Sequence, residues 1–228
     1  MAVLRASLTS TPPAVLTPSV YTLDSSGAVN SYTKTHTRTA GAGLQATIIY
    51  RHGSNPAPTV TGVTFNGQAL TERGQDQIDG SGNIGCAVYT LDPGVGDDGG
   101  PFNLVWTLSS TDARDAVGWV TDITGTSGAQ ASGAAVASGS TSTSPTVNIT
   151  PANANGLLVG AIGCIDATGT VTKGAAWTQI DNSQSAGDSV AIEGALQWLA
   201  PGSTGVQACD GTLSTAKLWA ALVAGWNP

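Results

Sequence analysis

Few side chains in this sequence have a type and spacing that could perform catalysis. The two histidines are His36, which shares a face with Lys34 and Arg38 in an alternating Thr-rich segment, and His52, which precedes a Gly-Ser turn. We expect the His36 face to be solvated. No G-x-S-x-G segment supplies a nucleophile for a histidine to activate. We therefore do not expect a serine hydrolase.

The carboxylates also give no clear acid–base pair. A glycosidase needs two carboxyl groups that face each other across a cleft. Glu72 lies beside Arg73 at a hairpin end, where a surface ion pair is the simpler interpretation, and Glu193 alternates with apolar neighbours, so we expect it to face outward. The acidic loops at 76–80 and 92–100 lack the ligand spacing of a calcium loop, so we interpret their carboxylates as solvated turn residues. We predict a protein that is not an enzyme and has no metal or cofactor.

The composition limits the classes of partner. Only 10% of the 228 residues are charged, and the formal net charge is −7. The chain thus lacks the basic patch that a nucleic-acid partner requires. No apolar run approaches the length of a membrane span, and the first residues lack the apolar core of a secretory signal peptide. The composition is typical of an extracellular protein, yet we expect no export signal.

The cysteines give no sign of a redox or metal motif. Cys86, Cys164 and Cys209 are an odd number, and no two have C-x-x-C spacing. We interpret all three as small buried apolar residues. A single disulfide remains open as the alternative.

Short strands must position all of these residues. The 30 glycines and the abundant Thr disfavour helices. Residues 60–94 alternate around Asn66-Gly67, a hairpin turn signal, and then stop at Asp92-Pro93-Gly94, where Pro fixes φ and Gly accepts a positive φ. The pattern predicts an all-β antiparallel fold. Further strands are expected at 31–37, 44–51, 102–108 and 116–123.

The expected strands occur twice along the chain. Gly43-Leu44 lies 12 residues after Ser31, and Gly156-Leu157 lies 12 residues after Ser144. We therefore predict two pseudo-equivalent halves within one β-sandwich at 31–228, and two small domains are the alternative. Further matches align 64–68 with 176–180, 89–94 with 197–202 and 107–110 with 212–215, and pair Trp119 with Trp219.

The predicted halves, 31–124 and 144–228, are joined by an Ala/Gly/Ser/Thr-rich connection. Its small polar residues indicate a segment that is flexible or lies along a sheet edge. Because equivalent positions in the two halves carry aromatic residues, we expect most tryptophans to pack in the core or in a subunit interface. The residues concerned are Trp106, Trp119, Trp177, Trp198 and Trp219.

Residues 1–30 form a Pro-rich segment before the first of these strands. Its prolines exclude a helix or a central strand, but it keeps more apolar residues than a disordered linker usually has. We predict an extended arm that lies on its own domain or on a neighbouring subunit, with a loosely ordered tail as the alternative. Together with one tryptophan near the end of the chain, the arm supplies the predicted partner-interface residues: Pro12, Pro13, Val15, Leu16, Val20, Tyr21 and Trp226.

Residues 44–120 and 157–226 resemble a β-sandwich module of bacteriophage virion proteins and bacterial surface proteins. The shared elements are Gly156-Leu157-Leu158-Val159, the hairpin from Thr64 to Thr71, the corner from Tyr89 to Gly94, and Ala116-Val117-Gly118-Trp119. The resemblance implies a jelly-roll-like antiparallel sandwich. It carries no catalytic residues.

These observations together predict a non-enzymatic bacteriophage virion structural protein. We expect a capsid decoration (cement) protein that stabilises the shell from its outer surface, on the extracellular particle. Its expected partners are capsid or other virion proteins and further copies of itself in a homo-oligomer. The alternatives are a tail or fibre component, or a secreted carbohydrate-binding or adhesin module that stacks a glycan on a tryptophan such as Trp106 or Trp226.

Overall fold

The computed structural model describes residues 15–22, 29–53, 56–78, 83–96, 99–165, 169–185 and 191–228; side chains at 15, 16, 18–22, 132 and 133 are not described. Every regular element in these ranges is a β-strand, and all the strand pairs are antiparallel. The predicted all-β antiparallel fold is confirmed. No helix long and apolar enough to cross a membrane occurs among the described residues.

The strands form four sheets. Inner sheet I has the order β1 (Val15–Thr22), β9 (Ala113–Thr124), β3 (Gly43–His52), β7 (Asn83–Leu91), β6 (Thr71–Gln77). Outer sheet I has the order β2 (Ser31–Arg38), β8 (Gly99–Leu108), β4 (Val60–Phe65), β5 (Gln68–Ala69). Inner sheet II has the order β10 (Gly128–Ser142), β17 (Lys217–Asn227), β12 (Leu157–Ile165), β15 (Ile192–Leu199), β14 (Thr178–Gln184). Outer sheet II has the order β11 (Thr146–Ile149), β16 (Gln207–Leu213), β13 (Val171–Lys173).

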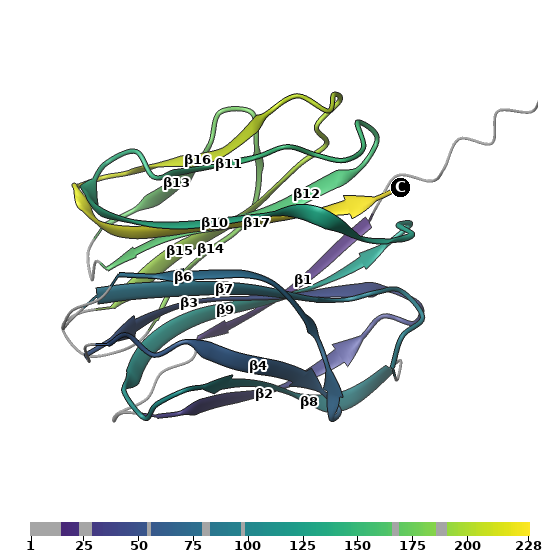
Figure 1. Cartoon of the computed structure of the whole chain (residues 1–228), viewed down its shortest axis with the longest axis horizontal. Coiled ribbons are helices and arrows are strands. Elements are labelled where there is room, and N and C mark those ends of the chain that lie inside the picture. Colours follow the sequence, from purple (N-terminus) through teal and green to yellow (C-terminus); the bar gives the residue numbers. More distant parts are fainter. Residues whose placement is uncertain are drawn as a thin grey trace, which may run out of the picture.

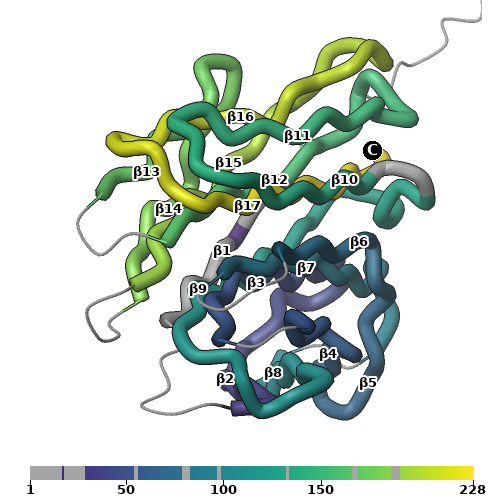
Figure 2. The backbone as a smooth tube through the Cα atoms, turned by 60° about the vertical axis from the view of Figure 1, so that its left-hand side comes forward, coloured from purple at the N-terminus to yellow at the C-terminus, as the bar shows by residue number. Residues whose placement is uncertain are grey.

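The four sheets lie in four layers (Figure 1), and the two halves of the chain are stacked on each other through their inner sheets (Figure 2). The inner sheets meet with their strand orders reversed. β3 packs against β12, β9 against β15, β7 against β17, β6 against β10, and β1 against β14. An approximate two-fold relation between the halves follows from this arrangement, with β3 and β12 at its centre.

Three hydrophobic cores separate the four layers. The first-half core lies between outer and inner sheet I, the central core between the two inner sheets, and the second-half core between inner and outer sheet II. All ten residues of β3 are buried, as expected for a strand covered on both faces. The four layers differ from the single two-sheet sandwich that we favoured. The reason is that each half closes its own core and then buries its second face on the other half.

The order of the strands recurs in the two parts of the chain. β1 to β4 occupy the same places in their sheets as β10 to β13, β6 and β7 the same places as β14 and β15, and β8 and β9 the same places as β16 and β17. The two-residue strand β5 has no counterpart among the described strands. Even individual hydrogen bonds recur: the Thr59 amide donates to Ser109 Oγ (3.0 Å), and the Thr170 amide donates to Ser214 Oγ (2.9 Å). The match of 107–110 with 212–215 is confirmed by these bonds.

Two of the predicted matches between the halves are wrong. Thr178 begins β14 opposite Trp198, as Thr71 begins β6 opposite Thr90, so 176–180 does not correspond to 64–68. Trp119 packs in the central core, whereas Trp219 packs against the second-half core. These two tryptophans therefore lie on opposite faces of their sheets and are not equivalent.

The Ala/Gly/Ser/Thr-rich connection is a strand at a sheet edge. Residues 128–142 form β10, which pairs along β17 with two register shifts. The edge location that we expected is confirmed. Small residues are needed here because β10 lies close to bulky groups: a Cβ added to Gly139 would overlap the Trp219 ring.

Candidate functional site

The predicted interface residues lie in three different settings. Pro12 and Pro13 are outside the described residues. Val15, Leu16, Val20 and Tyr21 belong to β1, an edge strand whose backbone pairs with β9 of the same chain. An edge position fits Pro18, which cannot donate to a sheet ladder. The segment 15–22 thus lies on its own half, one of the two surfaces we had predicted.

Trp226 is fully buried inside the chain, which is not what we expected of a residue at a partner interface. Its indole Nε1–H donates to Gln45 Oε1 (2.9 Å), and the Gln45 amide donates to the Val159 carbonyl (3.1 Å). Its ring covers Gly43, where an added Cβ would overlap it. Trp226 therefore joins the two halves. Trp106, Trp119 and Trp177 are also buried, as predicted, whereas Trp198 and Trp219 are partly exposed.

His36 and Arg38 face inward, so the prediction of a solvated face is wrong. His36 Nε2 lies 2.9 Å from Asp122 Oδ1, and Asp122 Oδ2 accepts the Thr39 amide (2.6 Å). Arg38 donates to the carbonyls of Ala42, Asp92 and Val95. These polar groups satisfy one another at one end of the first-half core. Such an arrangement supports the chain turns around it and offers no activated nucleophile.

A buried charged pair joins β3 and β9. Arg51 donates from Nε and Nη2 to Asp115 Oδ2, at 2.9 and 2.5 Å. The side chains are 9% and 2% exposed. His52, the neighbour of Arg51, is fully buried as well. Both histidines are therefore buried side chains of the first half.

The two glutamates do not face each other. Glu193 is buried, contrary to prediction, and accepts the Val171 amide at Oε1 (3.1 Å) in the second half. Glu72 is exposed in the first half and accepts a hydrogen bond from the Tyr89 hydroxyl (3.1 Å). Arg73 bonds instead to Thr90 Oγ1 (2.6 Å). No group of three or more His, Cys, Asp or Glu that could hold a metal occurs in the described ranges.

Two acidic side chains bind the edge strand β10, and one of them, Asp92, is also 50% exposed, in line with the solvated position that we expected. Asp76 Oδ2 accepts the amide and the hydroxyl of Ser138, at 2.6 and 2.8 Å. Asp92 Oδ1 accepts the Ala129 amide (2.9 Å). The first half therefore holds both ends of β10 through carboxylates.

We expect Asp76→Ala to lower the free energy of unfolding by about 1–3 kcal/mol, because it leaves the Ser138 amide without its acceptor in a partly buried place. Amide hydrogen exchange in β10 should rise more than exchange in β12. Asp76→Asn, which keeps one acceptor oxygen, is the matched control and should lose less. Unchanged exchange in β10 would contradict a role of Asp76 in holding this strand.

None of the three cysteines forms a disulfide, and all three are buried, as predicted. The pKa of the Cys209 thiol is raised to about 12, mainly by burial, while a hydrogen bond from Gln197 lowers it and the nearby Asp210 carboxylate adds a smaller rise. Burial likewise raises the pKa of Cys86 and of the Tyr50 hydroxyl. These thiols are therefore poor nucleophiles in the folded protein.

The raised thiol pKa predicts a loss of stability at alkaline pH. The folded state keeps the Cys209 proton to a higher pH than the unfolded chain, whose thiol titrates near 8.5. This contribution is complete below about pH 8.5 and is lost as the pH rises toward the folded pKa. Urea unfolding between pH 7 and pH 11 should show the decline, and Cys209→Ala should reduce its slope. Rapid reaction of a thiol reagent with the folded protein at pH 8 would contradict the assignment.

The outward faces of the outer sheets are polar and weakly charged. They carry mainly hydroxyl and amide side chains, which suit contact with water or a polar surface. On outer sheet I the exposed residues include Ser31, Thr33, Thr35, Thr61, Asn103 and Thr107; on outer sheet II they include Thr146, Asn148, Thr172 and Thr212.

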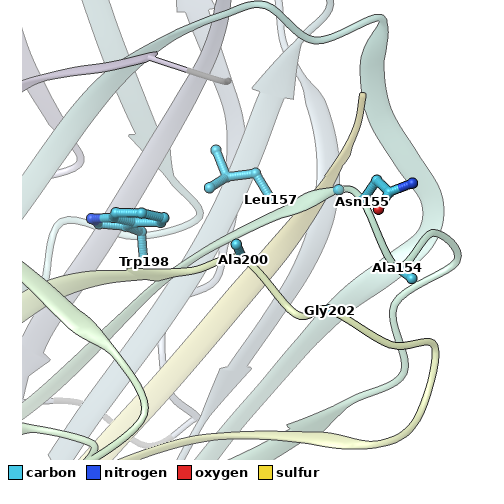
Figure 3. A pocket seen from close by; sticks show the side chains of 7 residues that line it. Ala154, Asn155, Leu157, Trp198, Ala200 and Gly202 are labelled. Carbon is cyan, nitrogen blue, oxygen red and sulfur yellow. The ribbon is translucent and has the colours of Figure 1, made fainter. Parts of the chain in front are cut away.

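A groove of about 410 Å³ opens at one end of inner sheet II. Trp198, Leu157 and Ala200 surround the same space, and Ala154 and Asn155 lie along its rim (Figure 3). Trp198 also packs against the central core. The groove is apolar and bears one partly exposed indole, so it suits a flat or apolar group better than an ion.

Sequence reasoning did not identify this groove. The signal was present in the repeat, where 197–202 matches 89–94: Trp198 stands at the place of Thr90, and Ala200 at the place of Asp92. Both strands pair with their inner neighbours in the same register, with Leu91 opposite Leu44 and Leu199 opposite Leu158. A large aromatic residue in place of a threonine marks a position where the halves differ.

No protein-family model, curated protein or solved structure matches this chain, so the comparisons add no identification to the geometry described above.

Proposed function

We propose that this chain is a bacteriophage virion structural protein that binds the outside of the capsid shell as a decoration protein. The duplicated strand order is the observation that supports it most. In the first half, β1-β9-β3-β7 forms one sheet and β2-β8-β4 the other, and the β5–β6 segment passes from the second sheet to the first. This order is compatible with a jelly roll, an architecture common in viral capsid proteins. The second half has the same order.

The surfaces also support a structural role outside the cell. The outer faces expose hydroxyl and amide groups and few charges, a chemistry that suits a particle exterior. The side chains of the pairs His36–Asp122 and Arg51–Asp115 are used inside the fold. A non-enzymatic protein that contacts capsid subunits and further copies of itself fits this distribution of polar groups.

The N-terminal segment is the part of the chain best placed to reach a neighbour. It leads directly into β1, an edge strand. An arm at an edge strand can add contact area to an interface without a new core. The proposed partners of this arm are capsid or other virion proteins.

The carbohydrate-binding alternative now rests on a different tryptophan. Trp106 and Trp226 are fully buried and do not offer a stacking face. Trp198, partly exposed in its groove, is the indole that could stack on a sugar ring.

Mass spectrometry of purified particles tests the proposal. The chain should be present in particles purified from a lysate, and antibody labelling in electron micrographs should lie over the shell; labelling of the tail would favour a tail or fibre component. Because β1 begins at Val15, deletion of residues 1–14 is the appropriate arm variant, and it should reduce binding to undecorated shells. A chain recovered only outside particles would overturn the proposal.

A further inference from the structure

The approximate two-fold relation allows the two ends of the inner sheets to be compared. β10 begins on the edge of inner sheet II, with Ala129 opposite Trp226, which is itself opposite Leu157. β1 begins on the edge of inner sheet I, with Leu16 opposite Ile123, which is opposite Gly43. The starts of β1 and β10 are therefore equivalent places.

At the start of β10, the other half provides a polar anchor. Asp92 accepts the Ala129 amide (2.9 Å), and Gly128 lies so close that a Cβ there would be 3.2 Å from Asp92 Oδ1. Arg73 donates to Thr90 beside it. The chain entering β10 is thus bound by the corner at the end of β7.

At the start of β1, the equivalent corner is the apolar groove. Trp198 and Ala200 stand where the first half has Thr90 and Asp92. No carboxylate is present at the Ala200 position to accept an amide from the incoming chain. The groove instead offers an indole face, a leucine side chain and about 410 Å³ of space.

We propose that this groove binds the Thr11-Pro12-Pro13-Ala14 segment of the same chain. This segment directly precedes Val15, where β1 begins, and β1 begins at the same end of the stacked sheets at which β17 ends (Figure 1). Four residues reach about 14 Å. Two consecutive prolines favour the polyproline II conformation, which docks against aromatic side chains with little loss of entropy. Leu16 is the counterpart of Ala129 in this register, so the proposed contact lies next to the place of the polar anchor and adds apolar contact there.

The inference does not depend on a role in virions. It requires that the groove and the N-terminal segment meet, whatever the protein binds elsewhere. It also explains why Trp198 occupies a position that is a buried threonine in the other half.

Disulfide trapping tests the contact in the full-length protein. Pro12→Cys combined with Ala200→Cys should form an intrachain disulfide, because a bridge requires Cα atoms within about 7 Å. A short tether gives an effective concentration near 1 mM, so at roughly 10 µM protein the intrachain product should exceed the interchain product about 100-fold. The three native cysteines are buried and do not compete. Pro12→Cys with Thr35→Cys, an exposed position on outer sheet I, is the matched control.

Each outcome decides the proposal. A cross-linked monomer that forms with Ala200→Cys and not with Thr35→Cys supports it. A cross-linked dimer would overturn it and assign the groove to a second copy, and equal trapping in both pairs would overturn it as well. Glycan binding that is lost in Trp198→Ala and unaffected by deletion of residues 1–14 would also overturn it and assign the groove to a sugar. None of these variants alters the buried pairs described above.

Discussion

Asp115→Ala is expected to lower the free energy of unfolding by about 3–5 kcal/mol, as is typical when one partner of a buried ion pair is removed. Arg51 would keep a guanidinium that is 9% exposed and has lost the carboxylate oxygen that accepts two of its hydrogen bonds. Arginine stays charged at any pH that the fold survives. The cost is therefore that of a buried charge that has lost this carboxylate, and urea unfolding at pH 7 measures it.

A double variant separates the cost of the orphaned charge from the value of the pair. Arg51→Met with Asp115→Leu replaces both charges by apolar groups in the first half, and such replacements are often neutral or stabilising. We expect the double variant to recover most of the stability that Asp115→Ala loses. A loss below about 1 kcal/mol in Asp115→Ala would be the value of an exposed pair and would contradict the burial described here.

Turn chemistry was predicted well because it is local. Asn66 and Gly67 have φ values of 49° and 78° between β4 and β5, and Gly94 has a φ of 71°. Proline and glycine act on the backbone within one or two residues, so their effect does not depend on distant packing. The expected strands at 31–37, 44–51, 102–108 and 116–123 lie in β2, β3, β8 and β9 for the same reason.

The buried and exposed faces of the strands were assigned wrongly where the alternation of residue types was the sole guide. The pattern correctly placed His36 and Arg38 on one face, but it could not say which face the protein covers. Partners such as Asp122 come from 86 residues away in the sequence. Glu193 was misplaced in the same way, because its acceptor role depends on Val171 in another sheet. Long-range partners decide whether a polar side chain is buried.

The repeat was found, but its register was off by one at the inner strands. Spacing from the preceding serines matched Leu44 with Leu157. Leu44 packs in the first-half core, however, and Leu157 in the central core. Leu158 packs in the second-half core and is the true counterpart of Leu44. A shift of one residue exchanges the two faces of a strand, so the central core and its groove could not be derived from spacing.

Trp226→Ala tests whether the two halves depend on each other. Trp226 lies in the central core with no exposed surface and reaches across to Gln45 and Gly43 of the first half. Removing a buried tryptophan costs about 3–5 kcal/mol through lost transfer free energy and the cavity left behind. Because the cavity opens between the inner sheets, we expect the variant to lose stability and still unfold in one cooperative transition. Circular dichroism and fluorescence in urea measure this transition. Two separated transitions would show that each half is stable without the central core.

Two further variants make the result specific. Trp226→Phe keeps an aromatic ring against Gly43 but leaves Gln45 Oε1 without its donor, so we expect a smaller loss of about 1–3 kcal/mol. Trp198→Ala removes a partly exposed ring and should destabilise less than Trp226→Ala. If Trp226→Ala were as mild as Trp198→Ala, the ring would not be filling a closed core. The difference in stability between the two variants also decides how a glycan-binding experiment is interpreted. Loss of binding in Trp226→Ala would indicate unfolding, whereas loss of binding in Trp198→Ala would indicate that the glycan binds in the groove.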